Sequence, residues 1–305
     1  MLSDEISRLV DSTGIDALGF AEASPFSNYA LRDSRRRDPK ISLPNAKTII
    51  VAGIYIGGLT LPAWKNPMYG RTSRLYLSGF FLDVVKPLEP IAAYLREEGF
   101  QAVVCDSSSD EGSILPLKLA AVRAGLGWQG KHSLLISRKY GTFLALGGII
   151  TDAVLAHNTE LEPNRCRECD RCRQACPMGA LDQPYVLDRK KCLSNSLQVE
   201  ELPEEAQVIM GNRVADCEIC QEACPWNKKH LSHPLDTAMT KKFQRQMKAW
   251  EEFFYLPHLA ELSEKEYIET LGRLNTGIPY EFFHRNVLIA LENEKRGRKG
   301  RQTNP

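Results

Sequence analysis

The chain has 305 residues and a mass of 34.3 kDa, enough for two ordinary domains with cores of their own. Its mean hydropathy of −0.30, with 43% hydrophobic and 25% charged residues, excludes a disordered or fibrous polypeptide. The 39 basic and 38 acidic side chains nearly cancel, so any contact with nucleic acid has to be local. No apolar run is long enough to cross a bilayer and the first residues carry no secretion signal, so we expect a cytoplasmic protein with no membrane partner.

The first half of the chain alternates between helical and strand patterns. Apolar residues at helical spacing predict helices near residues 6–10, 87–98 and 115–124. Short apolar and β-branched runs predict strands at residues 18–21, 48–56, 101–105, 133–137 and 143–151. The mixture predicts an α+β or α/β domain over residues 1–158, in which helices pack on a sheet.

Nine cysteines are the one unusual feature of the composition, and eight of them lie between Cys166 and Cys224. A cytosolic chain keeps its thiols reduced, so a disulfide framework is not expected. The first four of the eight follow the C-x2-C-x2-C-x3-C-P spacing of two-cluster ferredoxins, and the last three repeat its end. In that spacing three thiolates bind one [4Fe–4S] cluster and the fourth reaches the neighbouring cluster.

The spacing therefore predicts two [4Fe–4S] clusters with crossed ligand sets. The first cluster takes Cys166, Cys169, Cys172 and Cys224, and the second takes Cys176, Cys192, Cys217 and Cys220. Structural zinc is the alternative, since C-x2-C pairs also build four-cysteine zinc sites, but such sites need neither the triple spacing nor the two Cys-Pro ends. Cys105 is expected to be a small buried side chain at a strand end. Two adjacent clusters carry single electrons at low potential, which implies an external low-potential electron donor.

The rest of the chain divides around these cysteines. Residues 159–229 are expected to form a cluster domain that metal holds together more than apolar area does. Residues 230–305 are expected to be a mostly helical segment whose aromatic stripe, including Phe243 and Phe254, is more typical of a core than of a base-stacking platform. The segment ends in a basic tail at 295–301, which we expect to be disordered and solvated.

Several stretches around the cysteines are more specific than a ferredoxin motif. They are CPMGAL from Cys176, YVLDRKKC ending at Cys192, GNR from Gly211, CEICQEACPWN from Cys217, and AGLGWQGK ending at Lys131. Together they resemble the epoxyqueuosine reductase family, and the resemblance runs from about residue 18 to residue 286. It implies a nitroreductase-like domain that holds cobalamin beside a ferredoxin-like module, in a family related to reductive dehalogenases. It further implies that tRNA is a partner and that epoxyqueuosine at its wobble position is reduced to queuosine.

The resemblance also implies roles for individual residues. The family's general acid follows a strand, which makes Asp106 the catalytic candidate, with Asp110 and Glu111 as alternatives and an ordinary loop carboxylate as an equal alternative reading. The cofactor candidates share a place in the matching motifs: Gly125, Gly127, Trp128, Gly130, Lys131 and Asn212. The glycines let backbone approach a planar ring and the lysine can meet an amide or a phosphate, although a tight loop whose tryptophan fills the core would look the same.

Three departures from the family pattern bear on the substrate. Gly79-Phe80-Phe81 stands where members usually carry Asp-Tyr-His, the segment after Asp106 is several residues longer, and the helical-repeat extension that helps to grip tRNA is not expected beyond about residue 286. Two alternatives therefore stand beside tRNA modification. One is a related corrinoid iron–sulfur reductase acting on a small organic substrate. The other is a double-cluster electron-transfer protein without its own substrate, which the long α/β segment before the cysteines disfavours.

Overall fold

The computed structural model describes residues 2–29, 34–78, 85–105, 115–157, 160–247, 252–271 and 278–302. Its N-terminal part is built on a four-stranded antiparallel sheet in the order β1-β2-β6-β3. These strands are β1 (Ala17–Glu22), β2 (Thr48–Tyr55), β3 (Ala102–Cys105) and β6 (Leu144–Thr151), and a separate ladder joins β4 (Trp128–Gln129) to β5 (Leu135–Ile136). In the register, Ala17 pairs with Gly53 and Thr48 with Thr151. The predicted strands therefore exist, within a few residues at each end.

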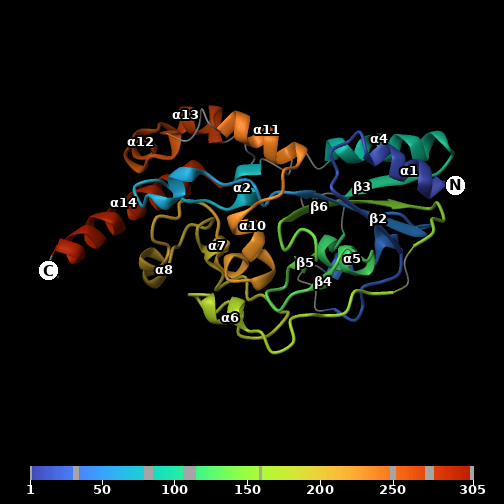
Figure 1. The fold of residues 1–305 in the computed structure, drawn as a ribbon, viewed down its shortest axis with the longest axis horizontal. Coiled ribbons are helices and arrows are strands. Elements are labelled where there is room, and N and C mark those ends of the chain that lie inside the picture. Colours follow the sequence, from blue (N-terminus) through green and yellow to red (C-terminus); the bar gives the residue numbers. More distant parts are fainter. Residues whose placement is uncertain are drawn as a thin grey trace.

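Helices cover both faces of this sheet. Neighbouring residues of a strand point to opposite faces, so Ile50 and Ile54 of β2 join one core with α1 (Leu2–Val10) and α4 (Val85–Glu97). Ile49 and Val51 join a second core under α5 (Leu117–Arg123). Figure 1 shows α1 and α4 on one side of the sheet and α5 on the other. This arrangement confirms the predicted mixture of helices packed on a sheet.

The segment that carries the cysteines has short helices joined by turns. They are α6 (Arg171–Ala175), α7 (Leu193–Ser196), α8 (Glu204–Ile209), α9 (Ile219–Glu222) and α10 (Lys228–Ser232). Another short helix, α2 (Arg74–Ser78), leaves the N-terminal part toward this segment. Short 3-10 turns η1–η5 lie at Ser34–Arg37, Pro39–Ile41, Pro62–Lys65, Pro225–Asn227 and Glu252–Phe254. Helices of about one turn have little stability of their own, so contacts with other parts of the protein must stabilise them.

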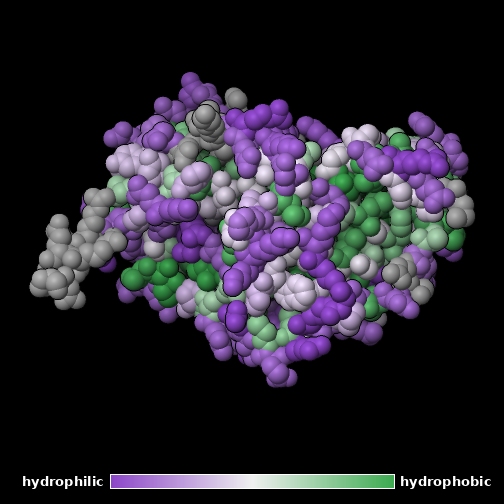
Figure 2. All heavy atoms as spheres, viewed as in Figure 1, coloured by the Kyte–Doolittle hydropathy of each residue, from purple (hydrophilic) through white to green (hydrophobic). Residues whose placement is uncertain are grey.

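The C-terminal segment is helical, as expected. Its helices are α11 (Ala238–Met247), α12 (Leu256–Glu261), α13 (Glu264–Glu269) and α14 (Tyr280–Gln302). Phe243 and Phe254 are buried, which confirms the core interpretation for these two aromatic residues. The same core contains Val214 from the cluster segment and Ile50 from the sheet, so one hydrophobic interior joins the three regions whose boundaries the composition predicts. Figure 2 shows hydrophobic side chains over the sheet at the right of the view and hydrophilic ones over the C-terminal helices along the top.

The expectation of a disordered basic tail is wrong for residues 295–301, because α14 continues to Gln302. Cations at the C-terminal end of a helix interact favourably with its dipole. Glu292 adds an ion pair to Arg296 one turn later, at 3.3 Å. The composition that suggested a solvated tail is thus compatible with a helix end. Within the described ranges, no helix has the length and apolarity that a membrane span requires.

Candidate iron–sulfur centre and its surroundings

The first predicted ligand set gathers around α6. The Cys169 amide donates to the Cys166 carbonyl at 2.8 Å, which closes a turn just before the helix, and Cys172 lies inside the helix. Burial raises the pKa of the Cys224 thiol to about 11, and the thiols of Cys166, Cys172 and Cys169 add to the shift. Charges couple in this way only at short range. The structure therefore brings Cys224 back to the three thiols of the earlier motif.

The second predicted ligand set gathers beside the first. Burial raises the pKa of the Cys217 thiol to about 12, and Cys192 is among the charges that add to the shift. Burial also raises the pKa of Cys220, and the thiols of Cys217, Cys192 and Cys176 raise it further, followed by Cys172 of the first set. Thiols of this set therefore act on one another's pKa, and Cys172 of the first set acts on that of Cys220.

Cys166 and Cys224, which the spacing assigns to one cluster, pack against the same small core, and α6 lies against α9. The complete crossed ligand sets stay a prediction. The thiols of Cys217, Cys220 and Cys224, whose pKa is raised, stay protonated in the metal-free chain, so iron binding has to displace protons and should be favoured at higher pH. The donor set, all sulfur, fits a pair of [4Fe–4S] clusters. Across the described ranges, no three histidine, cysteine or carboxylate side chains form a site for a single metal ion.

A buried ion pair fixes the second set to the N-terminal part. Glu218, next to Cys217, pairs with the guanidinium of Arg74 in α2, and both side chains are at most 4% exposed. A carboxylate oxygen of Glu218 also accepts from the Arg74 amide at 3.1 Å, while Arg74 Nε donates to the Gly57 carbonyl at 3.1 Å. Burial raises the pKa of Glu218 to about 7, and Arg74 opposes the shift. Sequence reasoning missed this pair, because its two residues lie far apart in the chain and neither belongs to a motif.

The asparagine of the Cys-Pro-Trp-Asn ending makes a second set of buried contacts, called here the Asn227 clamp. Asn227 is fully buried; its Oδ1 accepts from the Thr142 amide at 2.8 Å and its Nδ2 donates to Thr142 Oγ1 and the Gln221 carbonyl at 2.7 Å each. Gly141, with φ of +61°, makes room for it, since a Cβ there would lie 2.0 Å from Asn227 Oδ1. The clamp joins the loop after Cys224 to the turn before β6.

The motif that was predicted to cradle a cofactor packs against the first thiol set. Trp128 is 1% exposed and shares a small core with Ile136 and Cys224. Its ring meets Trp226 edge-on, with centroids 4.7 Å apart. Gly127, with φ of +155°, lies so close to Ile136 that a Cβ would approach its carbonyl oxygen to 2.0 Å. In the described structure this tryptophan therefore fills a core between the ladder and the cysteines.

The other cofactor candidates also have protein partners. Gly125, with φ of +76°, ends α5, and a Cβ on Gly130 would meet the His132 ring at 2.5 Å. Lys131 Nζ pairs with Asp170 at 3.0 Å, and Asn212 Nδ2 donates to the Tyr69 carbonyl at 2.9 Å. These contacts occupy the Lys131 ammonium and the Asn212 amide in the described structure. Their assignment to a cofactor stays a prediction.

The predicted acid lies outside the described residues. Asp106, Asp110 and Glu111 all fall in the segment 106–114, and the departure at 79–81 falls in another such segment. The strand that leads to Asp106 is described: β3 ends at Cys105, which is buried in the second core as expected. The chain is described again from Leu115, just before α5.

Lys118 at the start of α5 is the described residue that links this region to the thiols. Its side chain is exposed to solvent, yet the surrounding protein desolvates it and lowers its pKa. The thiols of Cys220 and Cys192 oppose that shift, whereas the cations Arg189 and Arg36 add to it. Lys118 is therefore the described residue of α5 whose charge is felt by thiols of the second set.

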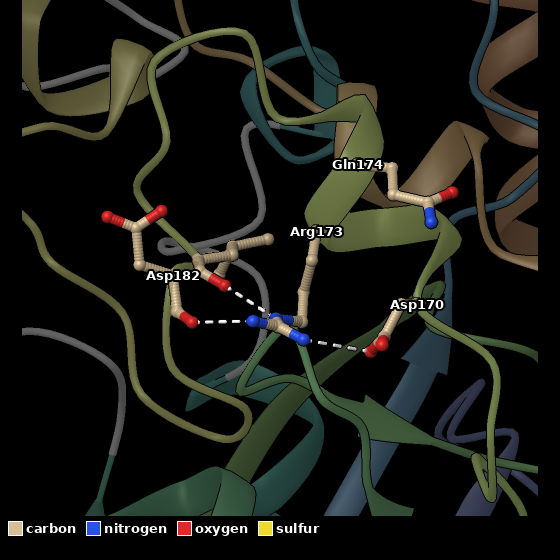
Figure 3. A pocket seen from close by; sticks show the side chains of 5 residues that line it. Asp170, Arg173, Gln174 and Asp182 are labelled. Atoms are coloured by element: carbon tan, nitrogen blue, oxygen red, sulfur yellow. Dashed lines mark hydrogen bonds and ion pairs between the residues drawn. The ribbon is translucent and has the colours of Figure 1, made fainter.

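A small open pocket borders α6. Asp170, Arg173, Gln174 and Asp182, labelled in Figure 3, line it together with Leu181. Its volume is about 270 Å³. Arg173 donates to the carbonyl oxygens of Leu181 and Asp182 at 2.9 and 2.6 Å and pairs with Asp170 at 3.2 Å. Its charge is thus used to fold the loop after α6, which indicates a structural role.

Residues 165–227 match the family described as the 4Fe-4S double cluster binding domain. With the eight cysteines of this segment and the covered sheet, this match defines an iron–sulfur protein that joins a double [4Fe–4S] domain to an α+β domain. The epoxyqueuosine reductase of Prochlorococcus marinus (strain NATL2A) is 30% identical over 255 residues, which cover 75% of this chain and 80% of that protein. The chain belongs to the epoxyqueuosine reductase family.

Other members show how far the likeness extends. The epoxyqueuosine reductase of Gloeobacter violaceus is 35% identical over 182 residues, which cover 59% of this chain and 55% of that protein. The Escherichia coli (strain K12) enzyme is 32% identical over 241 residues, which cover 75% of this chain and 59% of that protein. The chain thus spans little more than half the length of these two relatives.

Solved structures support the fold. A crystal structure of epoxyqueuosine reductase with an epoxyqueuosine-modified tRNA-Tyr stem loop superposes with a TM-score of 0.81, at 23% identity, over 96% of this chain and 81% of that one. A reductive dehalogenase structure, described as suggesting a mechanism for B12-dependent dehalogenation, gives a TM-score of 0.53 at 17% identity, over 91% of this chain and 38% of that one. At these identities the likeness shows a shared fold.

Proposed function

We infer that this protein is an oxidoreductase that reduces epoxyqueuosine in tRNA to queuosine, with two [4Fe–4S] clusters and cobalamin. One observation carries the inference: residues 165–227 match the 4Fe-4S double cluster binding domain, and Cys166 and Cys224, near the two ends of this segment, pack against one small core. Family membership supplies the reaction, since the relatives are named epoxyqueuosine reductases.

The two clusters suit the electron count of this reaction. Removal of the epoxide oxygen as water breaks two carbon–oxygen bonds and consumes two electrons and two protons. Each [4Fe–4S] cluster passes one electron at a time. We assign the second set to the last step before the substrate, because the charge of Lys118 in α5 is felt by its thiols Cys220 and Cys192.

Local charge near α5 also suits a nucleic-acid substrate. The chain is close to neutral overall, so phosphate binding depends on local cations. Lys118 and Arg36 supply two of them from separate segments. The tRNA stem loop in the related crystal structure makes RNA the substrate that fits this local charge.

Cobalamin is part of the proposal because a fold relative is described as performing B12-dependent chemistry. When bound, it would supply a cobalt centre that collects two electrons and acts as a nucleophile. No described residue is assigned to it. Asp106 remains the proposed general acid for the departing oxygen, since it directly follows β3.

The test is turnover in strictly anaerobic, iron-replete protein with added cobalamin. Epoxyqueuosine-containing tRNA should yield queuosine in the nucleoside digest, measured by mass spectrometry. Asp106→Asn should keep the iron content and lower the rate at least about 100-fold, as loss of a general acid does. Absence of queuosine from protein that carries eight irons and a corrinoid spectrum would refute the proposed substrate.

A second candidate keeps the cofactors and changes the substrate to a small organic molecule. The sequence Gly79-Phe80-Phe81, where the family usually carries Asp-Tyr-His, favours it because polar groups are replaced by aromatic ones. Substrate-induced oxidation of reduced protein by small epoxides or organohalides, with no response to tRNA, would support this candidate over the first.

A further inference from the structure

The segment 183–191, between Cys176 and Cys192, presents consecutive apolar side chains to solvent. Tyr185, Val186 and Leu187 are 38, 45 and 37% exposed. Scattered exposed hydrophobic residues are ordinary, but a contiguous group rimmed by polar residues is typical of an interaction site. Every residue from Asp182 to Lys191 is exposed, so the whole segment lies on the surface.

The segment is held in place rather than loosely attached. The Tyr185 amide donates to the Lys131 carbonyl at 2.9 Å, and the Asp188 amide donates to the Ala180 carbonyl at 2.9 Å. Tyr185 adopts φ of +70°, a conformation that costs a non-glycine residue free energy. The fold therefore stabilises a strained backbone that keeps these apolar side chains in water.

A short chain of contacts joins this surface to the first thiol set. Asn164 Nδ2 donates to the Tyr185 hydroxyl at 3.3 Å, and Asn164 Oδ1 accepts from the Cys166 amide at 2.9 Å. The other end of the segment runs directly into Cys192 of the second set. The exposed surface thus lies over the place where electrons from outside would enter.

The charge of the segment is positive. Arg189, Lys190 and Lys191 follow the apolar residues, and Asp188 is the acid among them. Lys191 pairs with Asp182 at 3.1 Å, whereas neither Arg189 nor Lys190 has an ion-pair partner within the part of the chain that the structure describes. An acidic partner would be attracted to this surface more strongly than a neutral or basic one.

We propose that residues 183–191, with Asn164 beneath them, are the docking surface for a small acidic protein that carries one electron. The aliphatic side chains of Val186 and Leu187 favour a protein over RNA, because single-stranded RNA is bound by cations and stacking aromatic rings. Two carrier molecules are each oxidised by one electron, and the two clusters are each reduced by one. This inference rests on the cluster assignment of the proposed function and is independent of its substrate.

The test is the rate at which a reduced plant-type ferredoxin, used as the acidic probe, reduces the oxidised clusters. Stopped-flow absorbance under anaerobic conditions measures it, with neither cobalamin nor tRNA present. In the wild-type protein, the rate should fall about tenfold between low salt and 0.5 M salt. In the double variant Leu187→Glu/Lys190→Glu, the low-salt rate should fall at least about tenfold. Reduction by dithionite, a small reagent, should be unchanged.

A matched variant controls for charge and exposure elsewhere. Lys265→Glu/Ile268→Glu makes the same changes on α13, where both side chains are exposed, and should leave both rates unaltered.

If the Leu187→Glu/Lys190→Glu variant loses iron, the milder variant Val186→Ser/Leu187→Ser replaces it in the same experiment. Wild-type protein that dithionite reduces and the carrier does not, or loop variants with wild-type carrier rates, would overturn the proposal. Weaker tRNA binding with unchanged carrier rates would reassign the surface to RNA. Protein without iron would instead refute the cluster assignment.

Discussion

At the scale of single residues, the most informative side chains are those that attach the cluster domain to the sheet. Asn227 and Glu218 each follow a cysteine by three residues or fewer, and each makes at least one hydrogen bond to the N-terminal part. Both are buried polar groups. Buried polar groups of this kind are costly when one partner is removed.

Asn227→Ala should lower the free energy of unfolding by about 2–4 kcal/mol, because the Thr142 amide and the Gln221 carbonyl lose their partner in a buried site. Anaerobic urea denaturation would measure this. Asn66→Ala is the control, since Asn66 is exposed and accepts one hydrogen bond from Met68; it should cost less than about 1 kcal/mol. If both variants lose the same unfolding free energy, the buried hydrogen bonds of Asn227 stabilise the protein no more than an exposed one does.

His132 predicts a pH dependence of stability. Burial, and to a lesser degree Lys118, lowers the pKa of His132 to about 4 from the ordinary value of 6.5. The unfolded chain therefore binds a proton first as the pH falls, so stability is present at pH 7 and declines between pH 6.5 and 4. The loss should be about 2 kcal/mol between pH 7 and pH 5.

The comparison of wild type with His132→Gln isolates this contribution. The variant should lose less stability over the same pH interval, because the glutamine does not titrate. Unfolding in urea at pH 7, 6 and 5 gives the two slopes. If they are identical, His132 is not held neutral by its surroundings.

At the scale of elements, the cluster helices and the sheet differ in what stabilises them. All eight residues of β2 are buried, whereas α9 has no buried residue and α6 buries only Cys172. Helices of four or five residues do not persist without external support. Cysteines lie on and beside these two helices, so we expect bound clusters to stabilise them.

Removal of iron should therefore unfold part of the molecule and leave the rest. After chelation, amide exchange measured by mass spectrometry should increase in α6 and α9, while β2 and β6 keep their protection. A uniform loss of protection, or none, would show that the cluster domain and the sheet do not differ in this way.

The sequence predicted the elements of the sheet better than their arrangement. The run at 48–56 is apolar and β-branched along its whole length, so a buried strand follows from composition alone. The insertion of β6 between β2 and β3 depends on pairings between distant residues, which no local pattern encodes. The short strand at Trp128–Gln129 was missed, since two residues give no period.

The candidate site shows the same division. The double-cluster domain could be predicted, because ligand spacing is a local property that cluster geometry dictates. The Arg74–Glu218 pair could not, since a charged residue gives no sign in sequence that it will be buried. The glycines around Trp128 were predicted to be required, and the structure accounts for Gly127 by its close approach to Ile136.

At the scale of the whole molecule, we propose a path for electrons. On this proposal they enter at the exposed positive and apolar surface of residues 183–191, pass the two clusters, and reach the substrate near Lys118 at the start of α5. One continuous core joins the sheet, the cluster segment and the C-terminal helices.

The most direct measurement is iron and acid-labile sulfide per chain in anaerobically purified protein, together with its zinc content. Two clusters predict eight irons and eight sulfides and no stoichiometric zinc. Cys192→Ala should retain about half the iron, because it removes a ligand from the second set alone. Zinc in place of iron, four irons per chain in the wild type, or unchanged iron in the Cys192 variant would contradict the account.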